Sequence, residues 1–232
     1  MCTSVDIVII SDAYNDELRI MTENAIISLY KSENYINFIT YIVESSNIDY
    51  SYINDNVHMV KPNPPFGYHK YLNLGRKEGN SEYVCLCNND LLFKNGWASS
   101  LISEMDKDEK LLSASPISYE PHISENLLRL DMGNTYGYKS IYNIAGWAIF
   151  QKRIIYDIIG DLDETMVFWY ADDDYGMVLK KYDLIHALVP TSRVDHLWSK
   201  TLFTKNEKEI KKLTTEQLNI YDTKWEHKGY HN

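Results

Sequence analysis

The sequence lacks most features that would place it in a special class of protein. It has 3 cysteines, 6 prolines and 10 glycines in 232 residues. The cysteines have no zinc-finger spacing and are too few for a disulfide scaffold. No apolar run approaches the ~18 residues that predict a membrane span, and the N-terminus does not resemble a signal peptide. We therefore expect a soluble, cytoplasmic protein.

Basic charge is also scarce. Lys and Arg number 23 against 33 Asp and Glu, which gives 23 − 33 = −10 at neutral pH. An acidic chain repels a phosphate backbone, so binding to nucleic acid would need a local basic patch. The short run at Lys205, Lys208, Lys211 and Lys212 is typical of a solvated helix face. The sequence gives no strong indication of nucleic-acid binding and does not predict an oligomeric state.

Short β-branched segments alternate with amphipathic ones along the chain. The expected strands are 5–10, 38–43, 57–60, 82–87, 111–116, 144–151 and 184–190, and the expected helices are 16–30, 69–79, 96–106 and 174–182. The first strand is apolar on both faces, which is typical of a parallel sheet covered by helices on each side. In such open α/β sheets, ligands bind beyond the carboxyl ends of the strands. No repeat or linker divides the chain, so we expect one domain over residues 1–232.

Polar residues follow the expected strand 82–87 directly. Asn88, Asn89 and Asp90 come where this strand ends. Carboxylate and amide oxygens are ligands that Mg²⁺ and Mn²⁺ prefer. The alternative is a plain turn, because all three residue types favour turns.

Three consecutive carboxylates follow a group of aromatic residues. Asp172, Asp173 and Asp174 come directly after Trp169, Tyr170 and Ala171. Like charges so close together raise the pKa of at least one carboxyl group, which suits a general base. The alternative is helix capping, because acidic residues stabilise the first turn of a helix.

A histidine, His196, follows the last expected strand. A single histidine is more often structural than a ligand. The order of this histidine and the other segments along the chain, however, carries more information than the histidine alone.

In this order the segments resemble glycosyltransferase family 2, whose members use nucleotide sugars and have the GT-A fold. The resemblance covers about 5–199. It rests on the segments 11–15, 43–46, 63–68, 73–75, 88–90, 146–150, 159–164 and 171–174, and on His196. Two positions depart from the family pattern: Glu44 stands where an Asp is usual, and Ala171 where a Glu is usual.

The resemblance implies an α/β fold with a Rossmann-like, open, mostly parallel sheet flanked by helices and a smaller acceptor-side β region. Residues 1–92 would form the nucleotide-sugar half, 93–200 the acceptor half, and 201–232 a helical tail.

The resemblance also implies roles for individual residues. Asp90 and His196 would hold the metal ion, Mn²⁺ or Mg²⁺. Asp172 would be the general base, and a shift of alignment would give that role to Asp173 or Asp174. The nucleotide sugar would contact Asn15, Glu44, Asn73, Asn88 and Asn89, and the sugar or acceptor would contact Gly146, Trp147, Trp169 and Tyr170.

The implied activity is a metal-dependent, inverting transfer of a sugar from a nucleoside diphosphate to an acceptor hydroxyl, with a UDP-sugar as the expected donor. Two alternatives stay open. The chain could glycosylate modified bases in DNA. Its Asn-, Ile- and Tyr-rich composition is typical of an AT-rich, viral or parasitic genome, which favours this alternative, whereas its acidic charge disfavours it. It could also be a nucleotide-sugar binding module without turnover, although the motif acids are all present.

Overall fold

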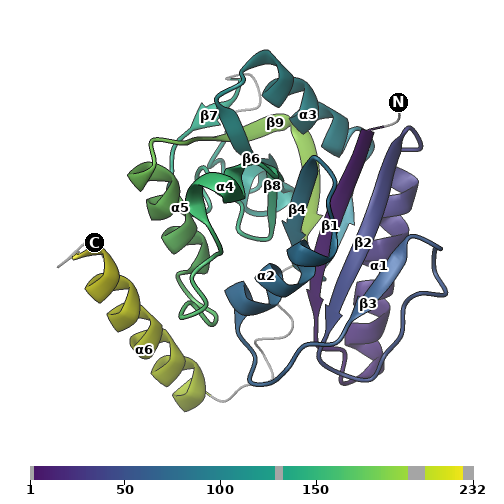
Figure 1. Ribbon diagram of the computed structural model, residues 1–232, viewed down its shortest axis with the longest axis horizontal. Helices are drawn as coiled ribbons and strands as arrows, with labels where there is room; N and C mark the ends of the chain where they lie inside the picture. Colours follow the sequence, from purple (N-terminus) through teal and green to yellow (C-terminus); the bar gives the residue numbers. More distant parts are fainter. Residues whose placement is uncertain (1–2, 129–132, 198–206, 227–232) are drawn as a thin grey trace.

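The computed structural model describes residues 3–128, 133–197 and 207–226 (Figure 1). The strands are β1 (Thr3–Ser11), β2 (Ile36–Glu44), β3 (Val57–Val60), β4 (Tyr83–Cys87), β5 (Leu91–Phe93), β6 (Leu111–Ile117), β7 (Thr135–Tyr136), β8 (Ala148–Lys152) and β9 (Ile185–His196). The helices are α1 (Asp16–Ser32), α2 (Tyr68–Glu78), α3 (Trp97–Lys107), α4 (Ile155–Ile159), α5 (Ala171–Lys181) and α6 (Glu207–Trp225), with a short π-helical turn at Tyr119–Ile123.

All nine strands join one sheet with the order β3-β2-β1-β4-β8-β6-β9-β5, and β7 pairs with β9. The strands β3, β2, β1 and β4 are parallel, as predicted for the first half of the chain. β8 runs antiparallel to both β4 and β6, and β9 runs parallel to β6. The mixed part of the sheet therefore belongs to the second half of the chain.

Helices cover both faces of the sheet (Figure 1). Val5, Ile7 and Ile9 of β1 belong to a core cluster with the apolar faces of α1 and α3. Val8 and Ile10 belong to a second cluster with residues of α2, α4 and α5. Burial on both faces explains the uninterrupted apolar run of β1, because each side chain has a helix to pack against.

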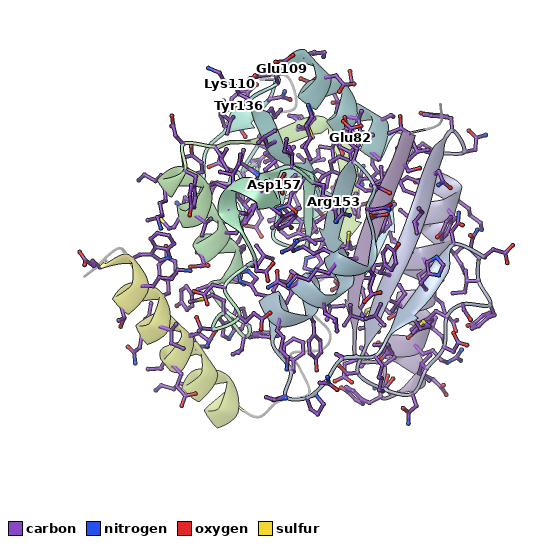
Figure 2. The ribbon with its side chains drawn as sticks, in the orientation of Figure 1. Glu82, Glu109, Lys110, Tyr136, Arg153 and Asp157 are labelled. Carbon is purple, nitrogen blue, oxygen red and sulfur yellow. The ribbon has the colours of Figure 1, made fainter. Side chains whose placement is uncertain are left out.

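A charged residue, Asp6, interrupts the apolar run of β1 and is fully buried. Its carboxylate accepts hydrogen bonds from the amide and hydroxyl of Ser81 and pairs with Arg153. Arg153 follows β8 and is labelled beside the sheet in Figure 2, and its amide donates to the carbonyl of Glu82. Asp6 thus ties β1 to the ends of β4 and β8.

Several element boundaries differ from the sequence prediction. β8 begins at Ala148 and not at Ile144, because residues 139–147 form a turn closed by hydrogen bonds from Asn143 and Ile144 to the carbonyl of Lys139. β9 continues past Pro190 to His196, because its second part pairs with β5. α5 begins three residues early, with the predicted acidic residues in its first turn.

The structure also contains elements that the sequence did not predict, namely β5, β7 and α4. The predicted helical tail 201–232 contains α6, and residues 201–206 and 227–232 lie outside the described residues. Within the described part of the chain, no helix is both long and apolar enough to cross a bilayer.

Candidate active site

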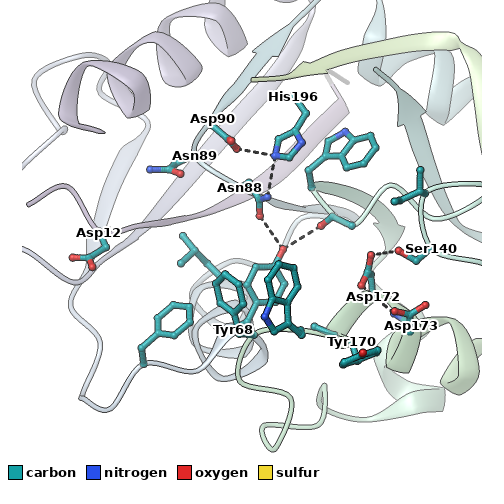
Figure 3. Close-up of a pocket in the computed structure, with 18 of the residues that line it drawn as sticks. Asp12, Tyr68, Asn88, Asn89, Asp90, Ser140, Tyr170, Asp172, Asp173 and His196 are labelled. Carbon is teal, nitrogen blue, oxygen red and sulfur yellow. Dashed lines mark hydrogen bonds and ion pairs between the residues drawn. The ribbon is translucent and has the colours of Figure 1, made fainter. Parts of the chain in front are cut away.

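A cavity of about 550 Å³ opens at the carboxyl ends of β1 and β4 (Figure 3). Ser11 and Asp12 line it from the end of β1, and Asn88, Asn89 and Asp90 line it from the end of β4. The N-terminal turn of α5 closes the opposite side. The cavity therefore lies where ligands bind in open α/β sheets.

Asp90 and His196 meet at one end of this cavity. Asp90 Oδ1 lies 3.1 Å from His196 Nε2, and Asn88 Nδ2 lies 3.5 Å from the same nitrogen (Figure 3). The antiparallel pairing of β5 with β9 brings them together, because Leu91 lies opposite His196 in the register. Sequence reasoning predicted this pair as metal ligands, and the structure places the two side chains in contact.

The donor set of this pair fits a divalent cation. A carboxylate oxygen and an imidazole nitrogen are ligands that Mn²⁺ accepts. Among the described residues no group of three or more His, Cys, Asp or Glu could hold a metal ion. Asp90 and His196 would therefore hold an ion with only part of its coordination shell and leave the rest for ligand oxygens and water.

Trp147 stacks on His196, with ring centroids 5.1 Å apart and planes 4° from parallel. His122 packs against the same indole at 5.5 Å. The predicted role of Trp147 was to stack on a sugar ring. It lines the cavity but is only 7% exposed, and its face toward His196 is already occupied. The indole therefore supports the imidazole of His196.

Asp172 and Asp173 line the other end of the cavity. Asp172 accepts a hydrogen bond from the hydroxyl of Ser140 and one from the amide of Asp173 (Figure 3). A Cβ at Gly146 would lie 2.8 Å from Asp172 Oδ2, so only glycine leaves room for this carboxylate. Burial, together with the charge of Asp172, raises the pKa of Asp173 to about 7.

Asp174 does not line the cavity. It is 1% exposed, its carboxylate pairs with Lys224, and it accepts a hydrogen bond from Trp225 Nε1 at 2.8 Å. Consecutive residues of an α-helix point about 100° apart, so three adjacent carboxylates cannot share one face. The prediction of Asp174 as a candidate base is therefore wrong, because its carboxylate lies outside the cavity and contacts α6.

Aromatic side chains form much of the wall between the two ends. Trp169 and Tyr170 line the cavity together with Phe66, Tyr68 and Phe168. Their contact with a sugar or acceptor stays a prediction. Tyr170 has a backbone φ of 61°, in the left-handed region that disfavours residues with a Cβ. The turn into α5 is therefore strained at the point where it faces the cavity.

The site contains residues that sequence reasoning did not assign. Tyr68 has its hydroxyl 2.9 Å from Asn88 Oδ1 and 3.1 Å from the carbonyl of Gly146, so it links two sides of the cavity. Tyr68 is the last residue of the segment 63–68, which is part of the family resemblance, so the sequence already indicated that it lies near the site. Asp12 belongs to the segment 11–15, which is also part of the resemblance. Nothing in the sequence around Ser140 indicated the contact of its hydroxyl with Asp172.

Two residues predicted to contact the donor, Asn15 and Asn73, have other roles. Asn15 caps α1 by accepting a hydrogen bond from the amide of Leu18 at 2.9 Å. Asn73 accepts from the amide of Leu162 and donates to its carbonyl, so it fastens α2 to the loop before α5. Neither side chain lines the cavity.

Glu44 and Asn89 have partly structural roles as well. Glu44 Oε1 accepts hydrogen bonds from the amides of Ala13 and Ser46, which shapes the loops after β1 and β2. Its Oε2 is buried without a partner, and the residue does not line the cavity. Asn89 lines the cavity but donates to the hydroxyl of Thr22. A contact between Glu44 and a nucleoside stays a prediction.

The charge of the cavity is strongly negative. Four carboxylates line it (Asp12, Asp90, Asp172 and Asp173), and no Lys or Arg does among the residues that the structure describes. An anionic ligand would be repelled unless a cation accompanied it. A diphosphate bound here therefore needs a divalent metal ion.

Two solved structures that are similar to this chain are sugar transferases. The chain is similar to GalNAc-T7, solved with UDP, GalNAc and Mn²⁺, at 14% identity and a TM-score of 0.59, over 84% of this chain and 43% of that one. It is also similar to the mannosyltransferase PcManGT from Pyrobaculum calidifontis, solved with GDP-Man and Mn²⁺, at 14% identity and a TM-score of 0.63. That match covers 84% of this chain and 57% of the other.

The chain thus spans about half the length of the solved structures it matches. No protein-family model matches the chain, and no curated protein does. The likeness shows that the chain has the GT-A fold predicted from the order of its motifs.

Proposed function

We propose that this chain is a metal-dependent glycosyltransferase of the family 2 type. It transfers a sugar from a nucleoside diphosphate to an acceptor hydroxyl, with inversion at the anomeric carbon. One observation carries the proposal: a single cavity at the carboxyl ends of the strands has Asp90 and His196 at one end and Asp172 and Asp173 at the other. The fold supports it, because the solved structures that share the fold bear the names of sugar transferases.

In this proposal the halves of the chain have separate tasks within one domain, 1–232. Residues 1–92 bind the nucleotide sugar, with a UDP-sugar as the expected donor, and residues 93–200 bind the acceptor. Asp90 and His196 would hold Mn²⁺ or Mg²⁺. When bound, such an ion stabilises the charge that develops on a departing diphosphate.

Asp172 is the proposed general base. The hydroxyl of Ser140 and the amide of Asp173 both donate to its carboxylate, so they fix its orientation toward the cavity. It would take the proton of the acceptor hydroxyl as the oxygen attacks the anomeric carbon from the side opposite the diphosphate, which inverts the configuration. Such proton transfer contributes about 10²–10⁴-fold to a rate.

Aromatic residues and Asp173 complete the acceptor end. Trp169 and Tyr170 offer apolar surfaces for a sugar ring or an apolar part of the acceptor. Asp173 has a pKa of about 7, so the negative charge beside Asp172 increases as the pH rises through neutrality. An anionic acceptor fits this end poorly, because Asp172 and Asp173 already line it.

The first test is thermal denaturation with UDP-, GDP-, dTDP- and CMP-sugars, each with and without Mn²⁺. A ligand at 100 times its Kd stabilises the native state by about 2.7 kcal/mol, which for a chain of this size shifts Tm by about 5–10 °C. We expect such a shift with one nucleotide, only when Mn²⁺ is present, and not in Asp90→Asn. No shift with any donor would contradict a diphosphate site at Asp90.

Turnover separates an enzyme from a binding module. With a radiolabelled donor, the wild type should release its sugar, and Asp172→Asn should reduce kcat by about 10²–10⁴-fold. Nucleotide binding in the presence of Mn²⁺ should stay unchanged in that variant, because Asp172 lies at the other end of the cavity. Binding without any sugar release by the wild type would favour the module.

A further inference from the structure

Helix α6 packs against the segment that carries the acceptor side chains. In Figure 1 it lies outside the layers of sheet and helices, beside the loop that leads into α5. Thr214 of α6 lines the cavity. The helix therefore contributes to the wall of the site as well as to its support.

Lys224 of α6 joins the two ends of this segment. Its Nζ lies 2.7 Å from Asp163 Oδ2 and 2.7 Å from Asp174 Oδ1. Trp225 Nε1 donates to the same carboxylate of Asp174. Because Asp174 is almost completely buried, loss of Lys224 would leave an uncompensated charge in the interior.

Gln217 holds the middle of the segment. This side chain is only 3% exposed, and its Oε1 lies 2.8 Å from the amide of Val167 and 3.4 Å from the amide of Phe168. Its Nε2 lies 3.4 Å from the carbonyl of Thr165. A buried side-chain amide that satisfies loop backbone groups fixes the path of that loop.

Tyr221 supports the strained turn. Its ring stacks on Tyr170 with centroids 5.6 Å apart and planes 26° from parallel. A backbone in the left-handed region persists only where its surroundings hold it there. Tyr221 packs on the strained residue Tyr170, which is separated by Ala171 alone from the catalytic candidates Asp172 and Asp173.

We propose that α6 is a positioning element of the acceptor end, and that Gln217, Tyr221 and Lys224 hold residues 163–174 so that Trp169, Tyr170 and Asp172 face the cavity. The part of this inference that concerns the acceptor rests on the proposed function. These α6 residues act through the segment they hold, and none of them is assigned a contact with the reacting atoms.

The decisive experiment is hydrogen exchange on the wild type, Lys224→Met, Lys224→Arg and Lys211→Met. Lys211→Met is the matched control, because it removes the same charge from an exposed position on the same helix. We expect the amides of Val167, Phe168 and Asp174 to exchange at least tenfold faster in Lys224→Met, with the amides of β4 unchanged. Lys224→Arg should restore protection, because a guanidinium can reach both carboxylates.

Unchanged exchange at these three amides in Lys224→Met would overturn the proposal, and so would equal loss in Lys211→Met. If Lys224→Met does not fold, Tyr221→Ala gives the same comparison, because it removes the ring behind Tyr170 without leaving a buried charge. Exchange requires no substrate, so its outcome does not depend on the proposed activity.

A kinetic comparison tests the link to function. Binding of UDP with Mn²⁺ should stay within twofold of the wild type in Lys224→Met, because Asp90 and His196 lie at the other end of the cavity. Hydrolysis of UDP-glucose, in which water takes the glucosyl group and UDP is released, should lose at least tenfold in kcat with little change in donor KM. A donor KM that rises as much as kcat falls would overturn the assignment of α6 to the acceptor end, whereas a wild type that binds no nucleotide would contradict the proposed function itself.

Discussion

At the scale of single residues, Asp172 and Asp173 show how neighbours can differ. Both line the cavity, yet Asp172 accepts two hydrogen bonds, whereas burial and the charge of Asp172 raise the pKa of Asp173 to about 7. A carboxyl group with an unfolded pKa near 3.9 then binds more protons in the native state than in the unfolded state between about pH 4 and 7. Its contribution to stability is therefore lost as pH rises through this range.

Asp173→Asn should remove this pH dependence. We expect the variant to be more stable than the wild type at pH 8, by on the order of 2 kcal/mol after allowance for solvent screening, and to differ little at pH 4.5. Urea unfolding at both pH values measures the difference. Asp55→Asn, at an exposed turn, is the control and should show no such gain. Equal stability of Asp173→Asn and wild type at pH 8 would contradict the raised pKa.

The residue scale also shows where sequence reasoning stops. Residue types at strand and helix ends indicated Asp90 and the acidic cluster of Asp172 and Asp173, whereas His196 was assigned to the metal only through the order of motifs in the family resemblance. It did not separate Asp174 from its neighbours, because the direction of each carboxylate depends on where α5 begins.

Asn73 shows a second limit. It belongs to a segment that resembles a donor motif, yet it fastens α2 to the loop at Leu162. Gly75, in the same segment, leaves room for a close approach of α2 to the sheet, since a Cβ there would lie 2.4 Å from Val8 Cγ1. A short motif of this kind can arise from packing between elements as well as from contact with a ligand, and only the tertiary structure distinguishes the two causes.

At the scale of elements, the buried pair of Asp6 and Arg153 joins strands that are far apart in sequence. Arg153 also donates to the carbonyls of Arg76 and Ser81. Loss of one partner of a buried ion pair leaves the other charge unpaired in the interior, which costs about 3–5 kcal/mol. Arg153→Met should therefore lower the free energy of unfolding by about that amount in a urea titration.

A half-buried arginine at the surface, Arg19, provides the comparison. Arg19 pairs with Asp16 and Glu23 on the outer face of α1, so Arg19→Met should cost less than about 1 kcal/mol. The double variant Asp6→Asn with Arg153→Met should recover part of the loss, because it removes both charges. Similar costs for Arg153→Met and Arg19→Met would show that the buried pair does not hold the sheet together.

Long elements were easier to predict than short ones. β1 and β4 are apolar runs buried on both faces, and β2 alternates buried with half-buried side chains before a buried end, so the sequence pattern and the burial of these strands agree. β5, β7 and α4 have two to five residues each, too few to show a period. β9 was cut short in the prediction at Pro190, because only the tertiary pairing with β5 reveals its second part.

At the scale of the whole molecule, the order of motifs along the chain predicted the GT-A fold, which the solved structures confirm. The reason is topological: parallel strands bring their carboxyl ends to one edge, so polar segments far apart in sequence meet there. The role of α6 was beyond prediction, because its contacts to residues 163–174 depend on where the tail lies in space.

The charge of the whole molecule bears on one of the two alternatives, a transferase acting on modified bases in DNA. The chain carries a net charge of −10, and the described residues that line the cavity include four carboxylates and no Lys or Arg. Proteins that bind DNA without sequence preference have a Kd of about 10⁻⁴–10⁻⁶ M, and contacts to 6–10 phosphates weaken this by about 10³–10⁵ between 50 and 200 mM salt.

We therefore expect no binding of AT-rich DNA, with or without hydroxymethylated bases, at protein concentrations of about 50 μM and at either salt concentration, because the molecule offers too little positive charge to release counterions. Fluorescence anisotropy of a labelled 20-base-pair duplex and of its single strand measures this directly. A tenfold or greater loss of affinity between 50 and 200 mM salt would reveal phosphate contacts and favour DNA as the acceptor. Absence of binding at both salt concentrations would contradict DNA as the acceptor.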